Sequence, residues 1–159
     1  MPEAQAEAVL GRFTEHTRTW FTGAFEAPTA AQLGAWDAVS SGRNALVIAP
    51  TGSGKTLSAF LWALDGFLRE PVADEDPAPT KVLYVSPLKA LGVDVERNLR
   101  APLIGITQTA RNAGQQVPDI RVGVRSGDTP AAERRRLVQD PPDILITTPE
   151  SLYLSLIHI

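Results

Sequence analysis

The sequence predicts an α/β fold with a mostly parallel sheet covered by helices on both faces. Short apolar runs that suit buried strands alternate along the chain with longer stretches whose apolar residues recur at helical spacing. Residues 45–48 are apolar at every position, which indicates a strand buried on both faces of a parallel sheet. A glycine-rich loop follows this run directly, and such folds bind ligands at the C-terminal ends of their strands.

Composition and charge limit the classes of protein. The chain has 159 residues, 43% of them hydrophobic and 21% charged, which suits one domain with a buried core. Its net charge of −3 gives no overall basic field, so nucleic-acid binding would need a local patch. The lack of cysteine excludes disulfides and cysteine-ligated metals, and the chain has neither a signal peptide nor an apolar run of about 20 residues. We therefore expect a soluble cytoplasmic protein.

Helical structure is predicted on both sides of the glycine-rich loop. Apolar residues recur at helical spacing over residues 3–25, and Thr29 with Gln32 forms a capping box that opens a helix to about Ser41. Gly42 is a natural end for this helix. After the loop, residues 55–69 carry their leucines on one face, which predicts an amphipathic helix.

The second half of the chain continues the alternation of strands and helices. A proline-rich and acidic stretch, residues 71–80, predicts an exposed loop before a strand at residues 82–85. A helix is expected from about Leu88 to Leu103, with Pro102 as an interruption.

Two further strands are predicted, each followed by the same kind of helix start. They are residues 121–124 and residues 143–146. Thr129 and Thr148 are each followed by a proline, and a threonine cap with proline at the first helical position is a typical helix start.

A phosphate-binding loop for a nucleoside triphosphate is the clearest local signal. Gly52 and Gly54 let the backbone curl closely around phosphates, and the following helix points its positive end at them. We expect Lys55 to reach the β- and γ-phosphates and the Thr56 hydroxyl to bind Mg²⁺, so these two are the expected catalytic residues. Ala49 stands where the usual pattern has glycine. The loop residues expected to bind ATP are Pro50, Thr51, Gly52, Ser53, Gly54, Lys55 and Thr56.

Four further segments narrow the kind of nucleotide-binding protein. They are residues 25–32 upstream of the loop and residues 85–91, 125–129 and 147–152 downstream of it. In this order they resemble the first motor domain of superfamily 2 DEAD/DEAH-type helicases, over about residues 21–154. The forms Ser-Pro-Leu-Lys-Ala-Leu, Ser-Gly-Asp-Thr and Thr-Thr-Pro-Glu-Ser-Leu are most similar to the large helicase-related (Lhr) family.

The resemblance implies a three-layer, RecA-like P-loop NTPase fold, truncated here. It also implies an ATP-dependent helicase that uses ATP and Mg²⁺, with DNA repair as the process it suggests. It places Gln32 on the adenine edge, where a side-chain amide offers both a donor and an acceptor. Gln32 also fits the capping box with Thr29, and the two roles can hold at different times. Phe25 is a candidate for stacking on adenine, and packing in the core is an equal alternative.

The resemblance also places contacts to the backbone of a nucleic acid on the three downstream segments. Hydroxyls, basic side chains and helix-start amides all bind phosphates, although ordinary turns and caps are the structural alternative. Backbone contacts do not read bases, so we expect binding that tolerates sequence changes and weakens as salt rises. The expected nucleic-acid residues are Ser86, Pro87, Leu88, Lys89, Arg125, Ser126, Gly127, Asp128, Thr147, Thr148 and Pro149.

Three consecutive arginines, Arg134, Arg135 and Arg136, lie in the helix expected after Pro130. Successive helical residues point about 100° apart, so the three side chains cannot share one face. We interpret them as a solvated surface rather than as a nucleic-acid patch.

The expected organisation is an N-terminal helical extension, residues 1–24, followed by an incomplete helicase ATP-binding domain, residues 25–159. Helicases of this kind hydrolyse ATP with an Asp-Glu box downstream of the fourth segment, and this chain has none there. We therefore expect a fragment that binds ATP and nucleic-acid backbone without efficient hydrolysis. The remaining helicase domains of a full-length protein would be its partners.

Three alternatives stay open at this point. A DEAD-box RNA helicase fragment has the same order of segments, and these residues do not decide between DNA and RNA. A non-catalytic nucleotide- or nucleic-acid-binding module agrees with the missing acidic box. A small-molecule kinase would share the loop but would leave Gln32 and the three downstream segments unexplained.

Overall fold

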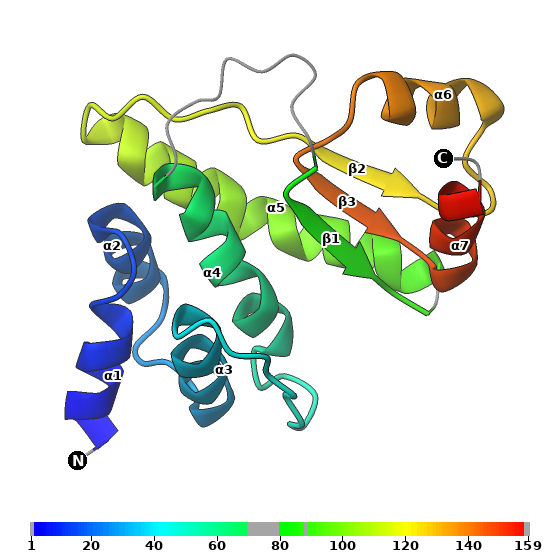
Figure 1. Cartoon of the computed structure of the whole chain (residues 1–159). Helices are drawn as coiled ribbons and strands as arrows, with labels where there is room; N and C mark the ends of the chain where they lie inside the picture. The colour runs from blue at the N-terminus through cyan, green and yellow to red at the C-terminus, as the bar shows by residue number, and fades with distance from the viewer. Residues whose placement is uncertain (1, 70–79, 88, 158–159) are drawn as a thin grey trace. The chain divides into compact units, whose positions relative to one another are not determined.

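A computed structural model describes residues 2–69, 80–87 and 89–157 of the chain (Figure 1). The chain divides into two compact units, each of which is described by itself. The helical unit comprises Met1–Pro71 and Leu99–Pro118, and the sheet unit comprises Val72–Asn98 and Asp119–Ile159. The loop predicted at residues 71–80 lies almost wholly outside the described residues. The boundary expected after residue 24 stays a prediction.

The helices and strands follow one another as the alternating pattern predicts. In chain order they are α1 (Pro2–Leu10), α2 (Glu15–Ala24), α3 (Ala30–Ser40), α4 (Lys55–Arg69), β1 (Val82–Val85), α5 (Lys89–Asn112), β2 (Val122–Arg125), α6 (Ala131–Gln139), β3 (Ile144–Thr147) and α7 (Pro149–Ile157). None of the helices in the described part of the chain combines the length and apolar character needed to cross a membrane.

The core of the helical unit is built around aromatic side chains. Phe13 packs edge-to-face on Trp36 with 5.2 Å between ring centroids, and Phe21 packs on the same indole at 5.4 Å. Each such pair adds about 0.5–1.5 kcal/mol to the free energy gained by burial. Leu61 and Leu64 of α4 are also buried, so the amphipathic face predicted for residues 55–69 completes this interior.

Helix α3 begins and ends where its sequence predicts, to within one residue. The Thr29 hydroxyl accepts a hydrogen bond from Gln32 N at 3.2 Å, while Thr29 N donates to Gln32 Oε1 at 2.9 Å. These two bonds form the predicted capping box. Gly42 follows the helix with a φ of 71°, a left-handed conformation that glycine adopts without strain.

Helices α1 and α2 confirm the helical character of the N-terminal pattern, with a break between them. Thr14 starts α2, because its hydroxyl accepts a hydrogen bond from Thr17 N. The same residue is tied to α4 through Asp65, which is completely buried. The Asp65 carboxylate accepts bonds from Thr14 N at 2.9 Å, from the Thr14 hydroxyl at 2.6 Å and from Arg69 Nε at 2.7 Å. The buried Asp65 carboxylate thus links the start of α2 to the end of α4.

Trp62 of α4 is only half-buried. The Arg69 guanidinium lies 4.4 Å from the centroid of its indole ring and also bonds to the carbonyl of Arg12. Trp36 and Leu61, by contrast, are fully buried.

The strand predicted at residues 45–48 is wrong for this structure. The segment has no regular secondary structure, and Leu46 and Ile48 are 87% and 86% exposed. A strand needs neighbours that complete its backbone hydrogen bonds, and the described part of the helical unit contains no strand. An apolar run alone therefore does not determine the structure of this segment.

The helix interruption predicted at Pro102 is also wrong, because α5 continues through this residue. A proline inside a helix removes one hydrogen bond and costs about 3 kcal/mol. Leu99, Ile106 and Ala110 are buried on the same helix, and their packing offsets this cost.

Among its described residues, the sheet unit has three parallel strands in the order β1-β3-β2. The central strand, β3, buries Ile144 and Ile146. The strand predicted at residues 82–85 is confirmed, and those predicted at residues 121–124 and 143–146 each lie one residue later. In Figure 1 the three arrows point to the same end of the sheet, with α6 and α7 beside it. A parallel sheet with intervening helices confirms the predicted α/β class.

Of the two helix starts predicted at a threonine–proline pair, only the one at Thr148 has the predicted threonine cap. Pro130, predicted as the first residue of α6, lies at the N-cap position without a side-chain capping bond. Thr129, the predicted cap, instead accepts a hydrogen bond from Ser126 N at 2.8 Å, so its hydroxyl is used in the preceding turn. At α7 the prediction is confirmed, because the Thr148 hydroxyl accepts a bond from Ser151 N at 3.3 Å.

Candidate nucleotide-binding loop and nucleic-acid interface

The glycine-rich loop is curled, and α4 begins directly after it. Gly52 and Gly54 have φ values of 83° and 77°, a region that residues with a side chain rarely adopt. Ser53 closes the curl, because its N–H and its hydroxyl donate to the Pro50 carbonyl at 3.3 Å and 2.7 Å. The loop therefore has the close backbone curvature that binding an anion with N–H groups requires.

The Lys55 ammonium lies over the start of the same loop. Its Nζ donates to the carbonyls of Ala49 and Pro50 at 2.6 Å and 2.7 Å, and the residue is exposed. Lys55 is also the first residue of α4, whose positive end faces the loop. Thr56 follows it and is half-buried. A cation, a helix N-terminus and a curled backbone thus meet at one exposed point.

The start of α3 lies against this loop. The Thr29 hydroxyl donates to the Ser53 carbonyl at 2.9 Å, and a β-carbon added at Gly54 would overlap the side-chain amide of Gln32. Gln32 itself is only 4% exposed. The capping box and the phosphate loop are therefore one structure, which the sequence did not reveal because the two lie 24 residues apart.

Phe25 is 42% exposed and does not belong to the buried core. Its ring stacks on Phe21 at 5.0 Å and meets Trp20 edge-on at 5.9 Å. One side of the ring is held by its neighbours, and a stacking role for this residue stays a prediction.

In the sheet unit, the three predicted nucleic-acid segments meet at one edge of the sheet. Val85, Arg125 and Thr147 are the last residues of β1, β2 and β3, and the registers of the two strand pairs align them. Because the strands are parallel, all three following loops leave from this edge.

The first of these segments is only partly described. Ser86 is buried, and its N–H donates to the Thr147 carbonyl at 2.9 Å. Pro87 is exposed. Leu88 and the side chain of Lys89 lie outside the described residues.

The loop after β2 uses three of its own amides in hydrogen bonds within the loop. Ser126 N donates to the Thr129 hydroxyl, Asp128 N donates to the Ser126 hydroxyl at 3.3 Å, and Thr129 N donates to the Ser126 carbonyl at 3.2 Å. This turn is stabilised internally, so these three amides are not available to a ligand.

At the third segment both threonine hydroxyls are buried. The Thr148 hydroxyl caps α7 and also donates to Ser151 Oγ at 3.1 Å, while Thr147 Oγ1 lies 3.5 Å from the Thr148 carbonyl. Pro149, by contrast, is exposed at the first position of α7. The exposed feature at this loop is thus the helix N-terminus rather than the hydroxyls.

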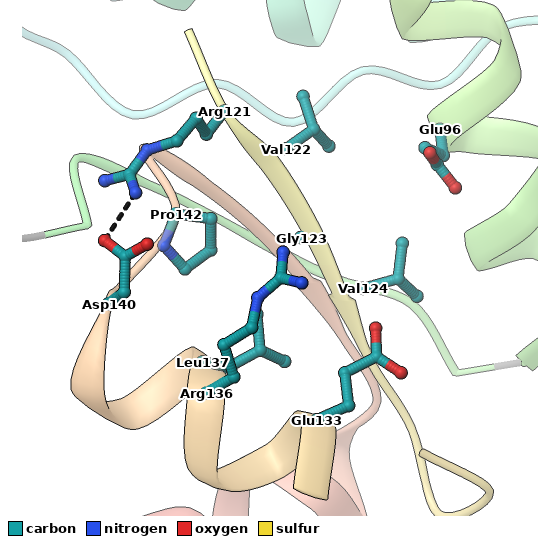
Figure 2. Close-up of a pocket in the computed structure, with 10 residues that line it drawn as sticks. All are labelled: Glu96, Arg121, Val122, Gly123, Val124, Glu133, Arg136, Leu137, Asp140 and Pro142. Carbon is teal, nitrogen blue, oxygen red and sulfur yellow. Dashed lines mark hydrogen bonds and ion pairs between the residues drawn. The ribbon is translucent and has the colours of Figure 1, made fainter. Parts of the chain in front are cut away.

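A groove of about 360 Å³ lies between β2 and α6 (Figure 2). Glu133 and Arg136 project from α6 toward β2, and at one end Arg121 bonds to Asp140. The hydrogen bond to Asp140 raises the pKa of Arg121, while partial burial opposes the shift. Side chains of both signs line this groove, so it favours neither anions nor cations.

Comparison with known proteins identifies the family. The model of the DEAD/DEAH box helicase family matches residues 29–158. The chain belongs to the DEAD/DEAH box helicase family, and membership in this family implies the use of a nucleotide. Within it, the chain is similar to Lhr helicases, as the sequence motifs predict.

Two curated relatives and one solved structure carry this similarity. The chain is 65% identical over 147 residues to the Lhr helicase/probable uracil glycosylase of Mycolicibacterium smegmatis, covering 92% of this chain and 10% of that protein. It is 55% identical over 148 residues to the Lhr helicase/uracil glycosylase of Escherichia coli, covering 91% and 10%. The structure of Mycobacterium smegmatis helicase Lhr bound to ssDNA and AMP-PNP matches with a TM-score of 0.84 and 64% identity, covering 93% of this chain and 18% of that one. The chain thus spans about a tenth of the length of these two curated relatives.

Proposed function

We propose that this chain is the ATP-binding part of an ATP-dependent nucleic-acid helicase of the Lhr type. The main support for this proposal is the curled phosphate loop. Gly52 and Gly54 bend the backbone at the N-terminus of α4, and Lys55 places an ammonium at the same point. These are the elements with which proteins hold the anionic phosphates of a nucleotide.

In this proposal each residue of the loop has a defined task. Lys55 exchanges its two carbonyl partners for phosphate oxygens, and the remaining loop residues from Pro50 to Gly54 surround the phosphates. Thr56 offers its hydroxyl to Mg²⁺, which neutralises phosphate charge when bound. Gln32 reads the adenine edge from its place beside Gly54.

The nucleic-acid site is proposed at the edge of the sheet where β1, β2 and β3 end. Arg125, Pro149 and the N-terminus of α7 are exposed or half-exposed there and suit phosphate groups. DNA is the proposed strand, because a relative with 64% identity has been solved with ssDNA. RNA is the alternative. The proposed location is the cytoplasm.

ATP titration by calorimetry tests the nucleotide site. We expect the 159-residue chain to bind ATP and Lys55→Ala to show no measurable binding, because the ammonium that neutralises the phosphates is gone. Lys81→Ala, an exposed lysine of the sheet unit, is the matched control and should bind as the unchanged chain does. Equal affinity of Lys55→Ala and the unchanged chain would refute the proposal.

A second experiment separates ATP binding from turnover. We expect the 159-residue chain to release little phosphate from ATP, with or without single-stranded DNA. In a full-length protein carrying this chain, single-stranded DNA should stimulate ATP hydrolysis. Robust phosphate release by the short chain would show that its own residues suffice for hydrolysis.

A further inference from the structure

Three arginines surround one shallow depression in the sheet unit. It has a volume of about 260 Å³, and its lining consists of Arg125, Arg134, Arg135, Val138 and Gln139. No acidic side chain is among these lining residues. Like charges gathered without a counter-charge repel one another, so a site of this composition favours an anionic ligand. We name it the arginine pocket.

The sequence interpretation of residues 134–136 as a solvated surface is incomplete. Arg136 lines the groove along β2 (Figure 2) and is not among the residues that line the arginine pocket. Arg134 and Arg135 line the arginine pocket together with Arg125. The three consecutive arginines thus divide between two sites, which their helical spacing allows.

Arg134 is held rigidly at the pocket. Its Nε donates to the Thr129 carbonyl at 2.8 Å, and its Nη2 donates to the Gly127 carbonyl at 2.7 Å. These bonds fix the guanidinium beneath the loop that follows β2. They use only some of its donors, because a guanidinium carries five N–H groups.

Arg125 and Arg135 differ from Arg134, because neither of their guanidinium groups makes a hydrogen bond or ion pair with any described residue. Arg125 is half-buried, and Arg135 is exposed. Elsewhere in the sheet unit, Arg121 is paired with Asp140 and Asp143. The guanidinium donors of Arg125 and Arg135 therefore remain available to a ligand, whereas Arg121 stabilises the fold.

The arginine pocket adjoins the edge where the three loops meet. Arg125 ends β2 and is the register partner of Thr147, the last residue of β3. Adjacent parallel strands lie about 4.8 Å apart, so the pocket begins one strand away from the loop that opens α7. A nucleic-acid strand bound at that loop has successive phosphates within reach of both places.

We propose that the arginine pocket binds a phosphate of the nucleic-acid strand, which extends the interface from the ends of the strands onto α6. This inference rests on the proposed function. Arg125 and Arg135 bind the phosphate oxygens, and Arg134 positions the loop while adding positive charge. Guanidinium groups suit this task because their planar N–H donors match phosphate oxygens. The contact carries no base information, so it adds affinity without sequence preference.

The test compares two neighbouring arginines of α6 in the 159-residue chain. Binding of fluorescein-labelled oligo-dT is measured by anisotropy over a series of NaCl concentrations. We expect Arg135→Gln to bind roughly fivefold more weakly at low salt, because one charge-assisted phosphate contact is lost. The slope of log K against log salt should fall by about 0.7, the value for one phosphate contact on a single strand.

Arg136→Gln is the matched control, since it removes the same charge from the next residue on the same helix. It should keep the slope of the unchanged chain and lose less than about half of its affinity. Equal losses for both variants would indicate a general charge effect and overturn the proposal, as would an unchanged slope for Arg135→Gln. If the unchanged chain did not bind oligo-dT or oligo-rU at all, the nucleic-acid part of the proposed function would fail instead, and this pocket with it.

Discussion

Gln32 of α3 lies directly against Gly54 of the phosphate loop, so that a β-carbon at residue 54 would overlap the side-chain amide of Gln32. The Thr29 hydroxyl supports the same contact through its bond to the Ser53 carbonyl. The first turn of α3 therefore forms a wall of the loop, and changes on either side of this contact should affect nucleotide binding.

Replacing Gly54 with alanine should abolish tight ATP binding. Alanine at a φ of 77° is strained by about 1–2 kcal/mol, and its methyl group would push Gln32 away. Calorimetry with ATP measures the loss, which we expect to exceed about tenfold in Kd. Gly34→Ala on α3 is the control, because its β-carbon meets open space. ATP affinity equal in both variants would contradict the structure of the loop.

Gln32→Glu separates the two roles of this residue. A glutamate keeps an oxygen that accepts from Thr29 N, so the capping box survives and the unfolding temperature should stay near that of the unchanged chain. The amide donor is lost, and ATP affinity should fall roughly tenfold if that donor binds adenine. A variant that binds ATP normally would leave Gln32 with its capping role alone.

Asp65→Ala should strongly destabilise the helical unit. It removes the buried acceptor of Thr14 and leaves the Arg69 guanidinium without its carboxylate partner. We expect a loss of about 2–4 kcal/mol in the free energy of unfolding, measured by urea denaturation. Asp37→Ala, which breaks ion pairs of partly exposed side chains with Arg12 and Arg43, should cost less than about 1 kcal/mol. Similar losses for the two variants would refute a structural role for the buried charge.

Two glycines inside helices should respond to alanine in opposite ways. Gly105 of α5 lies against the indole of Trp20, which leaves no room for a β-carbon, so Gly105→Ala should lower stability by about 1–3 kcal/mol. Gly66 of α4 faces open space, and Gly66→Ala should raise stability by about 0.5–1 kcal/mol through helix propensity. Thermal unfolding of both variants provides the comparison. If both changes raised the unfolding temperature, the contact between Gly105 and the Trp20 indole would be contradicted.

The sequence predicted those elements that depend on local interactions. The capping box of α3, the bounds of α4 and the threonine cap of α7 need only residues three or four positions apart, and all three are confirmed. Whether residues 45–48 form a strand depends on neighbouring strands. Whether α5 continues through Pro102 depends on the packing of that helix. Both lie beyond what a local pattern records.

In the candidate sites, too, features set by local sequence could be predicted, and features that depend on residues in different elements could not. The curl of the phosphate loop follows from Gly52 and Gly54, and the meeting of three loops at one edge follows from parallel strands. The bond between Thr29 and Ser53 joins residues far apart in the sequence, and Arg125 and Arg135 line one pocket although they belong to different elements. No spacing in the sequence indicates either of them.

The exposure of Leu46 and Ile48 has a practical consequence for experiments on the isolated chain. Two large aliphatic side chains on a backbone stretch with unpaired hydrogen-bonding groups offer a template for β-pairing between molecules. Concentrated solutions of the 159-residue chain should therefore self-associate through this segment. Replacing both residues with lysine would keep the chain monodisperse for the binding measurements.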